Sequence, residues 1–196
     1  MKSKILENKK KKMAKLYDSA YELFTAKGVH ATVIDEIVKR AGVAKGTFYL
    51  YCKDKYDLVD KVIVRKSSLV LDRALKALAE KKQTESLDFQ QSVVFFVDYL
   101  VQVFREDSRF LELIAKNLSL GLFQELFHCK EMESTREAFV RNFMLNGGTS
   151  DAAGKRLYLI VCMVGVVCYS SFVLEIPYRF DEIKPELYRS VEKILA

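Results

Sequence analysis

Polar side chains suited to binding an anion gather in one short stretch of this 196-residue chain. Residues 31–56 read ATVIDEIVKRAGVAKGTFYLYCKDKY. Within this stretch Lys45 offers a cation, Gly46 permits close approach to the backbone, and Thr47 offers a hydroxyl. The hydroxyls of Tyr49 and Tyr51 can reach phosphate oxygens. This combination is suited to binding the phosphates and base edges of nucleic acid.

Two short helices must position these side chains. Apolar residues recur at the spacing that gives a helix one buried face, and they are Ile34, Ile37, Val38 and Ala41. Thr32 is the expected N-cap of this helix, and Gly42 is expected to end it because glycine adopts positive φ at little cost. A second helix is expected over 44–49, with Phe48 as its buried anchor. Two helices joined by a tight glycine-containing turn are typical of a helix-turn-helix, whose second helix enters the major groove of DNA.

Positive charge is concentrated around this pattern. Residues 1–66 hold 16 Lys and Arg against 8 Asp and Glu, whereas the whole chain has a net charge of only +6. A protein that grips phosphates needs such local basicity. Lys53, Asp54 and Lys55 open the next expected helix, whose free N–H groups favour an anion. The run Lys9–Lys12 is either a solvated terminus or a basic arm along the DNA backbone.

The run AGVAKGTFYLYCKDKYDL resembles the DNA-binding signature of the TetR/AcrR family of bacterial transcriptional regulators. The resemblance covers roughly residues 9–60 and departs at Cys52, where the family usually carries an aromatic residue. It implies an all-α homodimer with a three-helix DNA-binding domain and a C-terminal domain that binds a small molecule. It also implies that Lys45 and Thr47 touch bases or neighbouring phosphates while other residues hold the backbone. The full set of implied DNA contacts is Thr32, Ala44, Lys45, Gly46, Thr47, Tyr49, Tyr51 and Lys55.

Long helices are favoured throughout, because the chain has only two prolines and eight glycines. Apolar periodicity predicts helices over residues 8–26, 54–82, 85–106, 108–127, 132–145, 157–174 and 185–195, with a break at Gly121. Since no Pro or Gly interrupts residues 47–120, we expect a continuous helix from Asp54 to transmit rigid-body movement. The expected fold is all-α, with a helix-turn-helix domain over 1–53 and a helical ligand-binding and dimerisation domain over 54–196.

Phenylalanines are frequent in the expected regulatory helices. Aromatic residues at helical spacing are usually core, but this set is richer than a small bundle needs. Apolar cavities between bundle helices are common ligand sites, so a cavity for a small, largely apolar effector is the second interpretation. The candidate pocket residues are Phe89, Phe96, Phe104, Phe110, Phe139 and Phe143.

Residues 157–174 contain no charge and meet the lower length limit for a membrane span. Serines and tyrosines dilute the run and no second span exists, so a buried helix at a dimer interface is favoured. Pro185 is expected at the first position of the last helix. In the family resemblance the last two long helices pair with their symmetry mates, which points to residues 149–174 and 184–196. The expected interface residues are Leu159, Met163, Val166, Tyr169, Leu187, Val191 and Ile194.

Metal and enzyme chemistry find little support in the sequence. The four cysteines form no CxxC pair and the two histidines lie far apart, so no metal and no cofactor are expected. No secretory signal precedes the cysteines, and a cytoplasmic location with reduced thiols is expected. The sequence has no P-loop, GxSxG or HExxH motif, which argues against an enzyme.

These patterns favour a ligand-responsive transcriptional regulator. We expect a repressor that binds a palindromic operator in double-stranded DNA as a homodimer and is released by a small, largely apolar effector. The alternative is a membrane-attached or scaffolding helical protein, built on residues 157–174 and the basic N-terminus.

Overall fold

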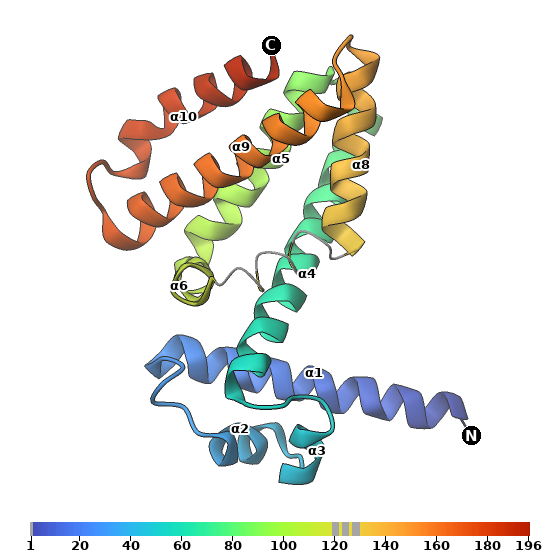
Figure 1. Cartoon of the computed structure of the whole chain (residues 1–196), viewed down its shortest axis with the longest axis vertical. Helices are drawn as coiled ribbons and strands as arrows, with labels where there is room; N and C mark the ends of the chain where they lie inside the picture. Colours follow the sequence, from blue (N-terminus) through green and yellow to red (C-terminus); the bar gives the residue numbers. More distant parts are fainter. Residues whose placement is uncertain (1, 119–121, 123–125, 127–129) are drawn as a thin grey trace.

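The regular structure is helical in the computed structural model, which describes residues 2–118, 122, 126 and 130–196 (Figure 1). The first helices are α1 (Lys2–Lys27), α2 (Ile34–Ala41), α3 (Lys45–Tyr49) and α4 (Lys55–Thr84). The chain continues with α5 (Phe89–Glu106), α6 (Ser108–Asn117), α8 (Lys130–Leu145), α9 (Ser150–Tyr169), the π-helical turn η1 (Ser170–Leu174) and α10 (Phe180–Leu195). The predicted all-α fold is confirmed.

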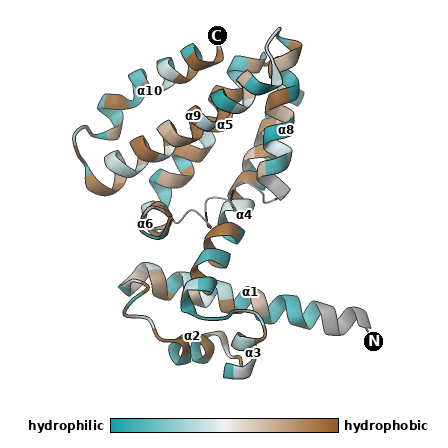
Figure 2. Ribbon diagram, in the orientation of Figure 1, coloured by the Kyte–Doolittle hydropathy of each residue, from teal (hydrophilic) through white to brown (hydrophobic). Residues whose placement is uncertain are grey.

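The first three helices and the start of α4 enclose one hydrophobic core. Its fully buried side chains include Leu16, Ile37, Phe48, Leu58 and Ile63. Helix α1 begins at Lys2, six residues before the predicted start, so the basic run 9–12 lies on a regular helix. That run is exposed and is coloured as hydrophilic in Figure 2.

Helix α4 connects the two ends of the molecule without a break. It has 30 residues, which gives a length of about 45 Å at 1.5 Å per residue. The predicted continuous connection is confirmed, and Figure 1 shows α4 rising from α1 to the helices of the other end. The first core continues along α4 to Val70 and also contains Phe110 and Leu113 of α6. A domain boundary after residue 53 therefore stays a prediction, since both sides share this core.

A second core lies among α5, α8, α9 and α10. Its buried residues include Val97, Phe139, Val164 and Val191, one from each helix. Polar contacts tie α10 to α5 beside this core. The hydroxyl of Tyr188 donates to Asp98 at 2.5 Å, and Arg105 pairs with Asp181 at 2.7 Å.

Helix α6 is shorter than predicted. It ends at Asn117, and Leu118 has extended backbone, whereas the sequence pattern predicted helix to residue 127. The break predicted at Gly121 lies outside the described residues. Leu122, beyond this end, is buried in the first core.

The last two long helices begin earlier than apolar periodicity alone predicted, and the start of α9 agrees with the range 149–174 taken from the family resemblance. Helix α9 starts at Ser150, because the Thr149 hydroxyl accepts the Ala152 N–H at 3.2 Å and caps a turn of polar residues. Helix α10 starts at Phe180, so the prediction that Pro185 opens it is wrong. The ring of Phe180 stacks on Phe172 with centroids 4.5 Å apart, and this packing fixes the added first turn.

Candidate DNA-binding interface and regulatory core

The turn between α2 and α3 has the predicted geometry. Gly42 adopts φ +65° and its N–H donates to the carbonyl of Lys39 at 3.2 Å. The next N–H, that of Val43, donates to the carbonyl of Val38 at 3.0 Å. These bonds end α2 with a left-handed residue, a conformation that costs a side-chain-bearing residue about 1–2 kcal/mol.

Helix α3 rests on the core through one side chain and leaves its outer face accessible. Phe48 is fully buried, whereas Lys45 and Gly46 are exposed and Thr47 is half-buried. The ring of Tyr49 is 54% exposed and packs edge-on against Phe48. A Cβ added at Gly46 would meet no heavy atom within 4 Å, so the backbone there is open to close approach.

An ion pair that the sequence pattern does not reveal joins α2 to α3. Asp35 Oδ1 lies 2.7 Å from Lys45 Nζ, with both side chains exposed. The hydrogen bond with this carboxylate raises the pKa of Lys45. Exposed ion pairs add little to the free energy of unfolding. The effect of this pair is to hold the Lys45 ammonium of α3 beside α2. Only the turn geometry brings these two residues together.

Thr32 lies inside the molecule instead of on its surface. Val33 occupies the N-cap of α2 without a side-chain bond, so the predicted N-cap is wrong. Thr32 is fully buried, and its hydroxyl donates to the carbonyl of Gly28 at 2.8 Å. This bond closes the turn after α1. The buried hydroxyl has a structural role in place of the predicted contact with a phosphate.

The start of α4 is capped by its own chain. The Asp54 carboxylate accepts the N–H groups of Tyr56 and Asp57 at 2.8 and 2.9 Å. The expectation that the free N–H groups here favour an external anion is therefore corrected, since Asp54 occupies two of them.

Lys55 ties the start of α4 to the turn after α1. Its Nζ donates to the carbonyls of His30 and Thr32 at 3.0 Å each. The Lys55 side chain has one further N–H for an acceptor. Ala44, another predicted contact, is the exposed N-cap of α3, while Tyr51 is half-buried.

Cys52 fills the core behind α3 at the position where an aromatic residue was expected. It is 2% exposed, and burial raises the pKa of its thiol to about 11, so the thiol stays protonated at neutral pH. The neighbouring carbonyl of Tyr51 accepts a hydrogen bond from Lys61 at 2.6 Å. The smaller side chain leaves the helix-turn-helix geometry intact.

This helix-turn-helix falls within a known sequence family. Residues 16–62 match the family described as bacterial regulatory proteins, tetR family. The DNA-binding region of this chain therefore carries the sequence pattern of the tetR family. The resemblance predicted over residues 9–60 is confirmed within the matched residues 16–62.

Several curated relatives share this DNA-binding region. The fatty acid metabolism regulator protein of Bacillus subtilis is 33% identical over 76 residues, or 39% of each chain. The regulator AcrR of Shigella flexneri is 43% identical over 47 residues, which is 24% of this chain and 22% of that protein. The chain therefore aligns with less than half the length of these two relatives.

Solved structures of TetR-family regulators share the fold over nearly the whole chain. The regulator FadR of Bacillus subtilis, solved in complex with stearoyl-CoA, superposes with a TM-score of 0.65 at 18% identity. The superposition covers 93% of this chain and 96% of that one. A TetR variant of Acinetobacter baumannii in complex with minocycline gives a TM-score of 0.62 at 12% identity, covering 92% of each chain.

Three of the six predicted pocket phenylalanines meet between α5 and α8. The ring centroid of Phe89 lies 5.3 Å from that of Phe139 and 6.0 Å from that of Phe143. Phe139 and Phe143 stack 6.1 Å apart and are both buried. Together these three rings, named here the phenylalanine cluster, form part of the second core.

The other three predicted pocket residues lie apart from the phenylalanine cluster. Phe110 is 1% exposed and packs in the first core, 6.2 Å from the ring of Tyr21. Phe104 packs against both cores, and Phe96 is half-buried on α5. The prediction of one cavity lined by all six is therefore wrong, because the two cores divide them.

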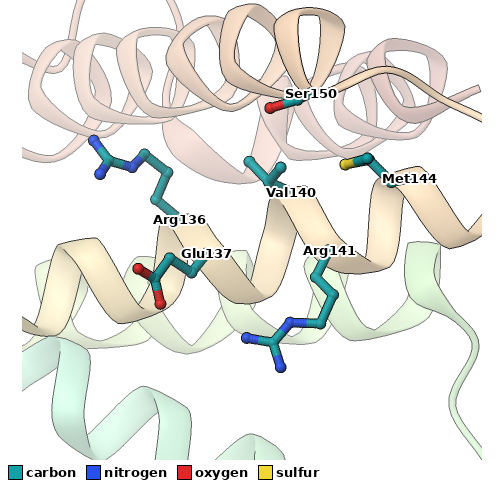
Figure 3. Close-up of a pocket in the computed structure, with 6 residues that line it drawn as sticks. All are labelled: Arg136, Glu137, Val140, Arg141, Met144 and Ser150. Atoms are coloured by element: carbon teal, nitrogen blue, oxygen red, sulfur yellow. The ribbon is translucent and has the colours of Figure 1, made fainter.

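An open hollow of about 450 Å³ lies where α8 faces the start of α9 (Figure 3). Its lining residues are Arg136, Glu137, Val140, Arg141, Met144 and Ser150. In Figure 3 the Arg141 side chain points away from α9, whereas Ser150 and Val140 face one another. None of the six phenylalanines lines this hollow, so it is not the predicted apolar cavity.

Helix α9 has one face in the core and one face in solvent. Leu157, Ile160 and Val164 are buried, whereas Leu159 is 52% and Val166 is 68% exposed. Figure 2 shows α9 as a largely apolar helix. By length and composition alone, Ser150–Leu174 could cross a membrane, and 28% of its most apolar window is buried. The exposed apolar face needs a covering partner or an apolar medium.

The predicted interface residues fall into two groups. Met163 and Tyr169 of α9 and Ile194 of α10 are half-buried and border the exposed face. Leu187 and Val191 are 3% and 0% exposed, in the core between α10 and the rest of the chain. Their assignment to an interface is wrong, because the amphipathic stripe of α10 is used within the chain.

A charged network that the sequence pattern does not reveal joins the two ends of the molecule. Asp107 Oδ2 accepts the hydroxyl of Tyr21 at 2.6 Å and the ammonium of Lys66 at 2.7 Å. Lys66 Nζ also lies 3.4 Å from the ring centroid of Tyr21. Asp107 in turn caps α6 by accepting the Phe110 N–H at 3.2 Å. We name Tyr21, Lys66 and Asp107 the interhelical network; it links α1, α4 and α6.

Opposing effects set the charge state of this network. Burial alone would raise the pKa of Asp107, but the hydrogen bonds from Lys66 and Tyr21 outweigh burial, so the pKa is lowered. Burial and the same carboxylate raise the pKa of Tyr21. At neutral pH Asp107 is therefore a carboxylate and Tyr21 a neutral phenol.

Proposed function

We propose that this chain is a transcriptional repressor that reads a palindromic operator through α3. The observation that carries this proposal is a five-residue helix anchored by Phe48, with Lys45, Gly46 and Thr47 on its open side. A lysine can donate to O6 and N7 of guanine, and a threonine hydroxyl can bond to any base edge. Ala44, which is exposed next to α3, would also contact DNA. The proposed contacts with phosphates are Tyr49, Tyr51 and Lys55.

The repressor acts as a homodimer in this proposal, with α9 at the interface. One α3 touches too few base pairs for useful affinity, whereas two half-sites one helical turn apart double the contacts. The exposed apolar residues Leu159 and Val166, bordered by Met163 and Tyr169, form a strip that a second copy would cover. A two-fold axis across α9 places the same strip on both copies.

The effector in this proposal is a small, largely apolar molecule that binds beside the phenylalanine cluster. The cluster supplies three aromatic rings between α5 and α8, next to the half-buried apolar residues Val93 and Val140. A FadR with the same fold is described in complex with stearoyl-CoA, and a relative is named a fatty acid metabolism regulator. A long-chain acyl group is therefore the first effector class to test.

The interhelical network gives this effector a route to the DNA-binding helices. Asp107 sits at the corner between α5 and α6, while its partners Tyr21 and Lys66 sit on α1 and α4. A shift of α5 caused by a ligand would move the Asp107 carboxylate and, through its hydrogen bonds, displace Tyr21 of α1 and Lys66 of α4. The spacing of the two α3 helices in a dimer would then change, so that both no longer fit adjacent major grooves.

Reciprocal binding measurements test this proposed coupling. An effector that binds the released form about 100-fold more tightly corresponds to roughly 2.7 kcal/mol of coupling, and operator DNA must then weaken effector binding by the same factor. Stearoyl-CoA would be titrated by calorimetry into the protein with and without a selected operator duplex. Equal affinities in the two titrations would exclude stearoyl-CoA as an inducer while leaving DNA binding itself untouched.

A membrane surface is the competing explanation for the apolar face of α9. The length and composition of Ser150–Leu174 permit it. Fractionation separates the two cases, since a dimeric regulator stays in the supernatant and binds duplex DNA, whereas an anchored protein sediments with membranes.

A further inference from the structure

A second open hollow, of about 710 Å³, lies in the angle between α1 and α4. Its lining residues are Met13 and Tyr17 of α1 with Lys61, Val64, Arg65, Ser68, Leu69 and Asp72 of α4. The α4 residues share one face of that helix and span about 16 Å along it at 1.5 Å per residue. The hollow is separate from α3 and from the phenylalanine cluster, so a ligand bound there would not contact the site of the proposed function.

A positively charged group in this hollow lacks an anion. The guanidinium of Arg65 lies 5.4 Å from the ring centroid of Tyr17, which holds it over the hollow. Within the part of the chain that the structure describes, Arg65 forms no ion pair or hydrogen bond. By contrast, Lys61 donates to the carbonyl of Tyr51 at 2.6 Å and to Asp57 at 2.9 Å. Arg65 is therefore the cation that is free to bind a ligand.

The lining of the hollow offers both polar and apolar groups. Tyr17 and Ser68 contribute hydroxyls to the same lining, and burial raises the pKa of Tyr17, so its hydroxyl remains a neutral donor. Met13, Val64 and Leu69 supply the apolar wall, and Leu69 is 47% exposed.

The end of the hollow opposite Lys61 carries an aspartate, Asp72, which disfavours a bound anion. Asp72 lies two turns beyond Arg65 on α4, and its carboxylate is paired with Lys76 at 2.7 Å. An anionic group is therefore favoured beside Arg65 and disfavoured beside Asp72. An elongated ligand would place its charged end at Arg65 and its uncharged body along Leu69.

We propose that the hollow between α1 and α4 is a binding site for a small amphipathic carboxylate, whose charged group pairs with Arg65 and whose apolar body lies against Met13, Val64 and Leu69. A planar guanidinium can bind both oxygens of a carboxylate, which adds geometric specificity to the charge. The ligand contacts both α1 and α4, so it stabilises their present arrangement.

Octanoate is the probe for this site, with octan-1-ol as the uncharged match. The full-length protein contains five methionines, so methyl-labelled methionine gives few resonances, each assigned by substitution to Leu. We expect octanoate to shift the Met13 resonance and to leave those of Met144 and Met163 unchanged. Octan-1-ol should bind at least about tenfold more weakly, since it cannot pair with Arg65.

Substitution of Arg65 decides whether the carboxylate is recognised. Arg65→Gln should weaken octanoate binding about tenfold or more, while Arg73→Gln, at an exposed arginine of α4 outside the hollow, should leave it unchanged. Unshifted Met144 and Met163 resonances in the free Arg65→Gln protein show that it is folded. The proposal is overturned if octanoate does not shift Met13, if it shifts Met163 instead, or if Arg65→Gln or octan-1-ol binds equally well.

Discussion

At the scale of single residues, the two glycines of the helix-turn-helix have different physical tasks. Gly42 has φ +65° and ends α2, whereas Gly46 lies within α3 with ordinary backbone and open space around it. Only Gly42 is required by the fold. The proposed function explains the glycine at position 46, because a side chain there would lie between the backbone and DNA.

Alanine substitution separates these two tasks. Gly46→Ala should keep or raise the free energy of unfolding, by up to roughly 1 kcal/mol, and should weaken DNA binding. Gly42→Ala should lower the free energy of unfolding by about 1–2 kcal/mol. Urea denaturation and duplex titration measure the two quantities. If a stable Gly46→Ala protein binds DNA with the wild-type affinity, DNA does not approach the backbone closely at Gly46.

Lys45 is the residue that we expect to contribute most to base reading. Lys45→Ala should cost on the order of 1–3 kcal/mol of operator binding and relax specificity at one position of each half-site. Lys76→Ala is the matched control, because Lys76 is also exposed and paired with an aspartate, yet lies far along α4. Equal operator binding by Lys45→Ala and Lys76→Ala would remove Lys45 from the contact set.

Residue roles that depend on tertiary position could not be predicted from the sequence. Thr32 has the composition and spacing of an N-cap, but the turn after α1 buries it. The partners of Lys55 are backbone carbonyls more than twenty residues earlier in the chain. By contrast, Phe48 and Gly42 were predicted correctly, because a helix period and a glycine turn are local patterns.

At the scale of helices, local signals predicted the existence of each described element better than its limits. The uncharged run 157–174 was recognised as one apolar helix, but apolar periodicity missed the capped turn of polar residues before it, which only the range 149–174 from the family resemblance included. Pro185 was expected to mark the first position of α10, but it lies inside the helix. The helix starts at Phe180, whose ring stacks on Phe172. The interhelical network escaped prediction, because Tyr21 and Asp107 are 86 residues apart in sequence.

The interhelical network should stabilise the fold in a pH-dependent way. Asp107→Asn should lower the free energy of unfolding by about 2 kcal/mol at pH 7, because Tyr21 and Lys66 lose a charged acceptor. The pKa of Asp107 is lowered in the folded state, so this contribution is present above about pH 4 and is lost as pH falls through that lowered pKa. Denaturation of both proteins from pH 3 to pH 7 measures the difference.

The control for this measurement is an exposed aspartate with a similar partner. Asp151 pairs with Lys155 in the first turn of α9, and both side chains are more than 70% exposed. Asp151→Asn should change the free energy of unfolding by less than about 1 kcal/mol. A constant difference between wild type and Asp107→Asn down to pH 3 would contradict the assignment of the effect to the Asp107 charge.

At the scale of the whole molecule, the exposed face of α9 should hold two copies together. Val166→Glu places a charge on that face at a residue that is 68% exposed, so it should yield folded monomers that bind an operator weakly. Val164→Glu, two residues away but 4% exposed, should instead unfold the second core. Sedimentation and circular dichroism distinguish these outcomes, and an unchanged dimer in Val166→Glu would move the interface elsewhere.

In the proposed repressor, two α3 helices of a dimer read a two-fold symmetric DNA sequence. This can be measured by selecting bound duplexes from a random pool with the wild-type protein. We expect an enriched inverted repeat whose half-site centres lie one helical turn, roughly 34–36 Å, or a multiple of it apart. Lys45→Ala should enrich a repeat with lost preference at one position per half-site. Absence of any enriched sequence, or enrichment of a single unrepeated site by the wild-type protein, would contradict the account.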